Sequence, residues 1–517
     1  MAAKSRTFNS IRNSSVAIVN NIMNIVLGFV YRTIFVLVLS KEYLGLNGLF
    51  TNILSLLSIA ELGIGSAIIF RLYKPVSVDN KERIIRLMNF YKRVYLLIAL
   101  VVSVIGFSIM PALKFLIADT SEIPSNVNVY VLYALFLLGQ ISSYICVHKQ
   151  SIIIADQREW IISICNIIGQ VIKYSSMIVV LFITENFTLV LIAQIVATIF
   201  VNVGITILAN KLYPFLRGAK GIIDKSERKE VYKETLALLN HRIGGAVVNG
   251  TDNILISAFI GLGILGLYSN YSLIIVSVTA LLSQLVSALS ASVGNLFVNG
   301  TREDVLRVYR RVQYINTFIS VYVMLSFCML INNFVRLWLG EDYVLGMSFV
   351  LVITFSNLIK LLRNTNLTFI NACGLYMKDK WRPFIEVAIN LGASILLVHF
   401  LGLNGIFLGT IISTVTVPLW REYYILNKNV FKSKKIIFVV IFQICAALIA
   451  TAMGVGLYYL FLIIPNTIGY FILKFFICLI GIPIVFFSLT FPMEERQYLT
   501  DFISRAFKKI LKKEIKE

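Results

Sequence analysis

The chain has 517 residues, of which 58% are hydrophobic and only 14% are charged, and its formal net charge is +21. A mean hydropathy of +0.84 excludes a soluble globular protein, because apolar runs long enough to cross a bilayer recur along nearly the whole length. Such a positive charge would suggest nucleic acid in a soluble protein, but basic loops on one side of a membrane explain it better. We therefore predict a membrane protein without a nucleic-acid partner.

The apolar runs predict an all-α integral membrane protein with fourteen transmembrane helices. The first six form an N-terminal lobe, residues 1–213: 15–39, 44–72, 95–117, 128–155, 160–184 and 187–212. A basic cytoplasmic connector, 214–233, precedes a second lobe, 234–430, with helices 234–260, 265–297, 314–339, 343–371, 377–401 and 404–426. Two additional helices, 436–462 and 466–491, fall in the segment 431–491, and the tail 492–517 is predicted to be a basic amphipathic cytoplasmic segment.

The distribution of basic residues predicts the orientation in the membrane. Among the Lys and Arg residues assigned to the loops, helix ends and termini, only Lys41, Lys114 and Arg336 fall on the side opposite the others. Because basic loops stay in the cytoplasm, this split places both termini there and requires an even number of spans. The remaining basic residues lie within the predicted helices: Arg32, Lys173, Arg242, Lys360, Arg363 and Lys474.

An internal repeat relates the two lobes. The motif Leu44-Gly45-Leu46 recurs as Leu265-Gly266-Leu267, at an offset of 221 residues. Three further matches follow in the same order: Lys81–Ile85 with Arg302–Leu306, Tyr91–Val94 with Tyr309–Val312, and Lys114–Leu116 with Arg336–Trp338. Since each repeat holds six helices, both copies have the same orientation. We predict a pseudo-twofold axis along the membrane normal, with a basic cavity between the lobes.

Helix two and its flanks resemble a known family. The segments Tyr43–Phe50, Ala60–Ala67 and Arg71–Pro75 resemble the Wzx-type polysaccharide flippases of the MATE-like multidrug/oligosaccharidyl-lipid/polysaccharide exporter superfamily. This resemblance implies a flippase that carries undecaprenyl-diphosphate-linked oligosaccharide across the bacterial cytoplasmic membrane by alternating access. Its partners would be that polyprenyl diphosphate, membrane lipid and other polysaccharide-assembly proteins.

A diphosphate cargo would need cations in a hydrated cavity, and its sugars would need amides. The substrate-binding candidates are Arg32, Arg242, Lys173, Lys360, Arg363, Asn20, Asn24 and Asn249. Arg32 is the leading candidate, with an ion pair to Glu61 or Asp252 as the alternative. Arg242 could instead snorkel to the headgroups, Lys360 and Arg363 could lie at the cytoplasmic rim, and the amides could fasten helices. The gating or coupling candidates are Glu61, Asp252 and Glu386.

Two other functions remain open on sequence grounds. A multidrug exporter on the same fold would favour an acidic cavity, whereas the residues within these helices are mostly basic. A polysaccharide polymerase or ligase would need a substantial outward loop, and the longest one here is near Asp119–Val127. The six cysteines lack a Cys-x-x-Cys pair and the three histidines are scattered, so we predict neither a metal site nor a cofactor.

Overall fold

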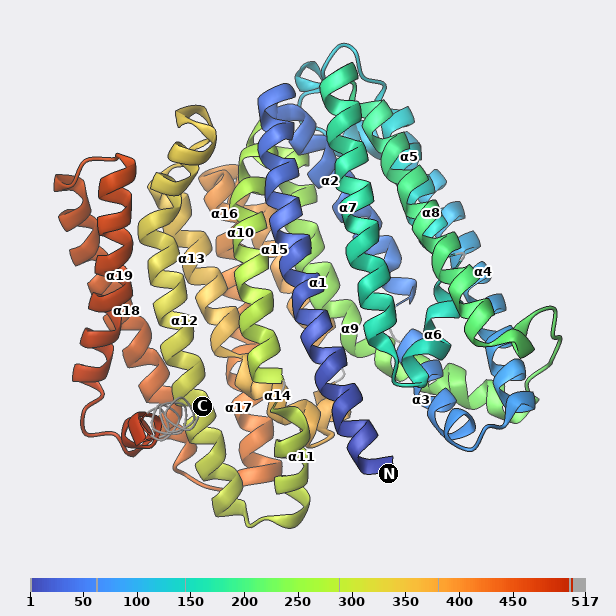
Figure 1. Ribbon diagram of the computed structural model, residues 1–517. Coiled ribbons are helices and arrows are strands. Elements are labelled where there is room, and N and C mark those ends of the chain that lie inside the picture. The colour runs from blue at the N-terminus through green and yellow to red at the C-terminus, as the bar shows by residue number, and fades with distance from the viewer. Residues whose placement is uncertain are drawn as a thin grey trace, which may run out of the picture. The chain divides into compact units, whose positions relative to one another are not determined.

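A computed structural model describes residues 2–61, 64–144, 146–287, 289–379, 381–501 and 504, and all the regular structure among them is helical (Figure 1). Side chains are outside this description at 2–11, 59–60, 64, 66–67, 233–249, 291, 376–377 and 462. The chain divides into two compact units, Met1–Ser269 and Asn270–Glu517. The predicted all-α membrane fold is confirmed.

Unit 1 contains the first nine α-helices and the beginning of the tenth. They are α1 (Ala2–Val38), α2 (Lys41–Leu57), α3 (Ile64–Ser77), α4 (Lys81–Ile109), α5 (Val129–Tyr144), α6 (Val147–Ala155), α7 (Glu159–Thr184), α8 (Phe187–Leu212), α9 (Lys225–Phe259) and α10 (Leu262–Ser287). Four short 3₁₀ turns connect them: η1 (Ser58–Glu61), η2 (Met110–Phe115), η3 (Thr120–Glu122) and η4 (Pro214–Leu216). The helix α1 lies along α7, and α7 lies along α8 (Figure 1).

Unit 2 contains the remaining helices. They are α11 (Ser290–Asn299), α12 (Arg302–Leu339), α13 (Met347–Leu362), α14 (Asn364–Ala372), α15 (Arg382–Leu401), α16 (Leu403–Thr414), α17 (Trp420–Leu426), α18 (Ile436–Ile463) and α19 (Ile468–Leu489). Shorter turns are η5 (Glu341–Tyr343), η6 (Leu375–Asp379), η7 (Val415–Leu419) and η8 (Asn427–Phe431). A capping box starts α12, in which Thr301 and Asp304 satisfy each other's backbone N–H groups.

Twelve helical segments of the described residues are long and apolar enough to span a membrane, and they match twelve of the fourteen predicted helices. The other two predictions, 44–72 and 234–260, correspond to α2–η1–α3 and to α9. The prediction of fourteen spans is therefore not confirmed as a count. In the first case α2 ends at Leu57 and the chain continues as the 3₁₀ turn η1.

Several predicted single helices are interrupted. The predicted helix 128–155 divides into α5 and α6, and its repeat partner 343–371 divides into α13 and α14. The two interruptions lie at similar places in the two repeats, which agrees with the internal duplication. The predicted helix 404–426 contains the π-turn η7, where Pro418 lacks an N–H donor and so breaks the regular hydrogen-bond pattern.

The two repeated Leu-Gly-Leu motifs contact each other inside unit 1. A Cβ on Gly45 would lie 2.2 Å from the carbonyl oxygen of Leu262, and one on Gly266 would lie 2.0 Å from that of Lys41. These contacts are reciprocal, because Lys41 and Leu262 are 221 residues apart, as are Gly45 and Gly266. Only glycine permits such close backbone approach, so the repeated sequence motif is explained by helix packing between α2 and α10.

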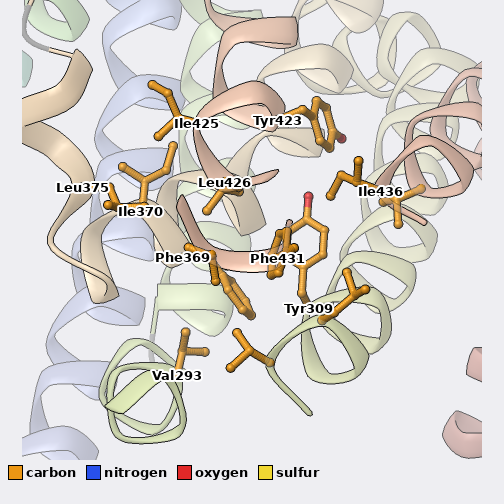
Figure 2. Close-up of a cluster of buried hydrophobic side chains, with 14 residues drawn as sticks. Val293, Tyr309, Phe369, Ile370, Leu375, Tyr423, Ile425, Leu426, Phe431 and Ile436 are labelled. Carbon is orange, nitrogen blue, oxygen red and sulfur yellow. The ribbon is translucent and has the colours of Figure 1, made fainter. Parts of the chain in front are cut away.

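In unit 2, buried aromatic and aliphatic side chains form a cluster that includes residues of α17 and η8 (Figure 2). The ring centroid of Tyr309 lies 5.0 Å from that of Phe369 and 4.7 Å from that of Phe431. The Tyr309 hydroxyl donates to Asn366 Oδ1 at 2.6 Å, and the Tyr423 hydroxyl donates to the side-chain oxygen of Gln443. The cluster fixes α17, and with it the buried ion network described below.

Candidate functional site

Arg32 is a partly buried cation on α1. Its Nη1 donates a hydrogen bond of 2.8 Å to the hydroxyl oxygen of Ser269 on α10, and Ser269 donates to the carbonyl oxygen of Gly266 at 2.7 Å. The ionisable groups that act on its guanidinium are the hydroxyls of Tyr31 and Tyr174. Among the described side chains no carboxylate forms an ion pair with Arg32, which leaves its charge uncompensated inside a predicted span.

A second cation lies close to the same tyrosines. The ring centroids of Tyr31 on α1 and Tyr174 on α7 are 5.8 Å apart, and Lys173 Nζ lies 4.5 Å from the Tyr174 centroid. The helices α1 and α7 run side by side in unit 1 (Figure 1). Two of the predicted substrate-binding residues, Arg32 and Lys173, are thus gathered around a pair of phenol groups. We call these four side chains the Arg32 cluster.

The three predicted amide residues of unit 1 differ in their surroundings. Asn20 Oδ1 accepts a hydrogen bond of 3.3 Å from Gln170 Nε2, so this amide fastens α1 to α7. Asn24 is exposed on α1. Asn249 lies on α9, where its side chain is outside the described residues, and the same is true of Arg242.

Glu61, one of the predicted acidic residues of unit 1, is bonded to a tyrosine and not to Arg32. Glu61 Oε1 accepts a hydrogen bond of 3.1 Å from the Tyr95 hydroxyl, which is itself 3.2 Å from the Tyr91 hydroxyl. Both tyrosines are buried, with 3% and 1% exposure, so Glu61 lies at the end of a chain of buried phenols. Asp252 is buried on α9 with 4% exposure. The alternative in which Arg32 pairs with Glu61 is not what the structure contains.

Unit 2 holds the other predicted charges in a different arrangement. Arg363 donates to Glu422 Oε1 from Nη2 at 2.7 Å and from Nε at 3.1 Å, and Arg382 Nη1 donates to the same oxygen at 3.0 Å. Glu386 lies 3.7 Å from Arg363 and 3.6 Å from Arg382. Exposure is 8% for Arg363, 9% for Glu386 and zero for Glu422, so both predicted residues are buried among opposite charges.

Two further residues complete this network. Asp379 Oδ1 accepts a hydrogen bond of 2.6 Å from Arg421 Nε, and Asp379 Oδ2 forms an ion pair with Arg382, whose Nε lies 2.6 Å away. Three arginines therefore face three carboxylates, and the group as a whole is neutral: Arg363, Arg382, Arg421, Asp379, Glu386 and Glu422. Lys360 is partly buried on α13 and acts electrostatically on Glu386. We call the six residues the Arg363 network, and it joins the junction of α13 and α14 to η6, α15 and α17.

Sequence reasoning missed half of the Arg32 cluster and most of the Arg363 network. Glu422 follows Arg421 near the end of the predicted helix 404–426, so this carboxylate gave no separate signal. Asp379, Arg382 and Arg421 lie at the predicted helix boundaries, where charges are ordinary. Ser269 and Tyr174 offered no signal, since a hydroxyl in an apolar helix is common and its neighbour comes from a distant part of the chain.

The residues present do not suggest a metal centre. In the part of the chain that the structure describes, no three His, Cys, Asp or Glu side chains come together as metal ligands would. The carboxylates that do lie close together, Asp379, Glu386 and Glu422, are each engaged by arginine. The chemistry of both groups is therefore that of ion pairing and hydrogen bonding.

Comparison with solved structures identifies the fold. The structure is similar to the lipid II flippase MurJ in an inward closed conformation, with a TM-score of 0.66, 13% identity, and 92% of this chain and 98% of that one covered. It is also similar to an inward-facing multidrug resistance MATE transporter of the MOP superfamily, with a TM-score of 0.60, 15% identity, and coverage of 81% and 99%. The MATE multidrug transporter DinF-BH gives a TM-score of 0.56, 16% identity, and coverage of 82% and 97%. The predicted MATE-like fold is thus confirmed.

Sequence comparison identifies the family. No curated protein sequence matches the chain. A family model described as polysaccharide biosynthesis protein matches residues 10–293, which include most of α1, η1 and all of α2–α10. The match covers more than half of the chain and agrees with the predicted relationship to polysaccharide flippases. The chain belongs to the polysaccharide biosynthesis protein family.

Proposed function

We propose that this protein is a flippase that moves undecaprenyl-diphosphate-linked oligosaccharide across the bacterial cytoplasmic membrane, with both termini in the cytoplasm. The family and the transporter fold support transport rather than catalysis. The observation that carries the proposal is Arg32, a guanidinium on a membrane-spanning helix with a hydroxyl partner and no carboxylate partner among the described side chains. Such a cation is suited to an anionic ligand.

The Arg32 cluster offers a diphosphate the groups it needs. The planar guanidinium can donate two parallel hydrogen bonds to one phosphate, and it stays charged when water is removed. Lys173, 4.5 Å from the Tyr174 ring, supplies a second positive charge, and the hydroxyls of Tyr31, Tyr174 and Ser269 can donate further hydrogen bonds. These groups come from α1, α7 and α10, so the ligand would be held by three helices.

The surface of α1 suits a cargo whose tail stays in lipid. Ile18, Ile22, Val26 and Val30 are exposed by 45–50% and recur every four residues, which makes one apolar stripe along the helix. Arg32 is two residues beyond Val30 and therefore lies on the other side of the helix. A polyprenyl chain could follow the stripe while the diphosphate stays at the cation.

Transport would then proceed by alternating access. The close contact of α2 with α10 at Gly45 and Gly266 lies at the end of these helices that is predicted to face outward. In our proposal these helix ends separate when the cargo leaves. An inside-negative membrane potential assists outward movement of negative charge by about 2.3 kcal/mol per charge per 100 mV.

The test uses the purified protein in lipid vesicles. Undecaprenyl-diphosphate-linked oligosaccharide placed in one leaflet should reach the other, as measured by its accessibility to an added glycosidase. Arg32→Ala should abolish this movement, whereas Arg158→Ala should leave it unchanged, because Arg158 is a half-exposed arginine paired with Asp156 at 3.0 Å. A cationic dye carried in place of the glycolipid would favour the multidrug alternative and would overturn the proposal.

A further inference from the structure

The loop between α4 and α5 lines an open surface cavity that the proposed function does not use. Its volume is about 700 Å³, within the range of ligand sites. The polar lining residues are Lys114, Thr120, Ser125, Asn126, Asn128 and Tyr130, and the rest of the wall is aliphatic apart from Pro124. All of them belong to unit 1. The loop lies on the side of the membrane that the distribution of basic residues assigns to the outside.

The loop that carries this cavity is held firmly on its other side. Glu122 Oε2 accepts hydrogen bonds from the backbone N–H groups of Leu262 and Gly263, at 2.5 and 3.1 Å, and so caps α10. The Ser257 hydroxyl donates to the carbonyl oxygen of Leu116 at 2.6 Å, and Ala118 N–H donates to the Ser257 carbonyl at 2.9 Å. Because these bonds fix the loop to α9 and α10, the cavity is preformed, which reduces the entropy lost on binding.

The two asparagines of the cavity wall can donate hydrogen bonds to a ligand through their side-chain NH₂ groups. Asn126 Oδ1 accepts from the Tyr43 hydroxyl at 2.5 Å, and Asn128 Oδ1 accepts from the N–H groups of Tyr130 and Val131 at 3.0 and 3.2 Å. Their oxygens are thereby used within the protein. Their NH₂ groups, with two donors each, remain for a ligand rich in acceptors, and the hydroxyls of Thr120 and Ser125 can both donate and accept.

The remaining wall suits a ring with polar edges and apolar faces. Tyr130 is 44% exposed, so its ring is available for contact with such a face. Lys114 is the one charged residue of the lining, and its Nζ lies 5.0 Å from the Phe115 ring. A wall with one ammonium group and no acid favours a ligand that carries a single negative charge.

We propose that this cavity is an outward-facing saccharide site that holds a sugar of the exported glycan, with preference for an acidic sugar such as a uronic acid. The proposal rests on the proposed flippase function for the identity of the glycan. Donor amides, hydroxyls, an exposed phenol and one ammonium group match the hydroxyls, ring faces and carboxylate of such a sugar. The site would hold the head of the cargo outside after the diphosphate has left Arg32.

Saturation-transfer NMR on the purified full chain tests the site. The probes are two free disaccharides, one with a uronic acid and one neutral, without lipid or diphosphate. Binding of the acidic disaccharide should weaken at least tenfold in Lys114→Ala, while the neutral one is unaffected, because only the acidic sugar loses a hydrogen bond between charged groups. Tyr130→Ala should weaken both, and the matched control Tyr470→Ala, with the same 44% exposure on α19, should weaken neither.

The outcomes separate this inference from the proposed function. Failure of either disaccharide to bind the wild type, or equal binding by all variants, overturns the saccharide site even if glycolipid still crosses the vesicle membrane. If glycolipid does not cross and both disaccharides still bind, the flippase proposal fails and the site stands. If Lys114→Ala lowers export only in cells, while the purified chain binds no disaccharide, the cavity receives a protein partner and the inference is wrong.

Discussion

Arg32 and Arg363 look alike in the sequence, since each is an arginine within a predicted transmembrane helix, yet their surroundings differ. Arg32 donates to a serine hydroxyl and lies beside two tyrosines. Arg363 is 8% exposed and is held by Glu422 at 2.7 Å, with Glu386 at 3.7 Å. The comparison teaches that a charge inside a membrane protein indicates a ligand site only when no acid of the protein neutralises it.

The largest effect should come from breaking the Arg363 network. Arg363→Ala leaves Glu422, which has zero exposure, with Arg382 as its remaining ion-pair partner among the described residues. We expect a loss of about 3–5 kcal/mol of stability and little folded protein, because a buried charge loses its compensation. The measurement is the thermal midpoint of the purified protein in detergent. The double change Arg363→Met with Glu422→Leu should recover part of the loss, and normal stability of the single variant would refute this assignment.

A change at Ser269 would make the surroundings of Arg32 resemble those of Arg363. Ser269→Asp places a carboxylate where the hydroxyl now lies 2.8 Å from the guanidinium. We expect a stable protein with export reduced about tenfold or more. The new carboxylate would form an ion pair with the guanidinium that the diphosphate needs. Ser269→Asn, which has a similar shape and no charge, is the control and should retain export. Equal export by the two variants would mean that Arg32 does not hold the cargo.

A smaller effect on stability is expected at Glu61, whose partner is a phenol. Glu61→Gln keeps an oxygen that can accept from the Tyr95 hydroxyl, so stability should change by about 1 kcal/mol or less. If Glu61 couples transport to protons, the dependence of glycolipid transport on an imposed pH gradient should disappear. The same measurement on Asp252→Asn, a change on α9, tests the second predicted coupling residue. Transport that keeps its full pH-gradient dependence in both variants would exclude proton coupling through these residues.

The sequence was sufficient for the fold, and it selected some of the residues that the structure brings together in the candidate site. Long apolar runs determine helices in a membrane, because every backbone polar group there must bond within its own segment. The interruptions were not predictable to the same degree, since those after Leu57 and at Arg363 both lie in the middle of long apolar runs. The repeat was visible in the sequence because close helix packing demands Gly45 and Gly266.

The sequence selected candidate site residues by their charge, and it did not identify the side chains that they contact. Arg32 and Lys173 stood out because charge is rare in apolar helices, and the structure gathers them around Tyr174. The same reasoning selected Arg363 and Glu386, which the structure places in a neutral network. Pairing of side chains from distant helices is a tertiary property, so a single sequence could not separate these two cases.

The central claim, that Arg32 holds the diphosphate, is tested most directly by glycolipid transport in vesicles with Arg32→Ala and Arg32→Lys. Lysine keeps the charge and loses the two parallel hydrogen bonds. We predict that both variants fold with thermal midpoints near that of the wild type, that the alanine variant transports no glycolipid, and that the lysine variant transports at an intermediate rate. Full transport by Arg32→Ala would contradict the account.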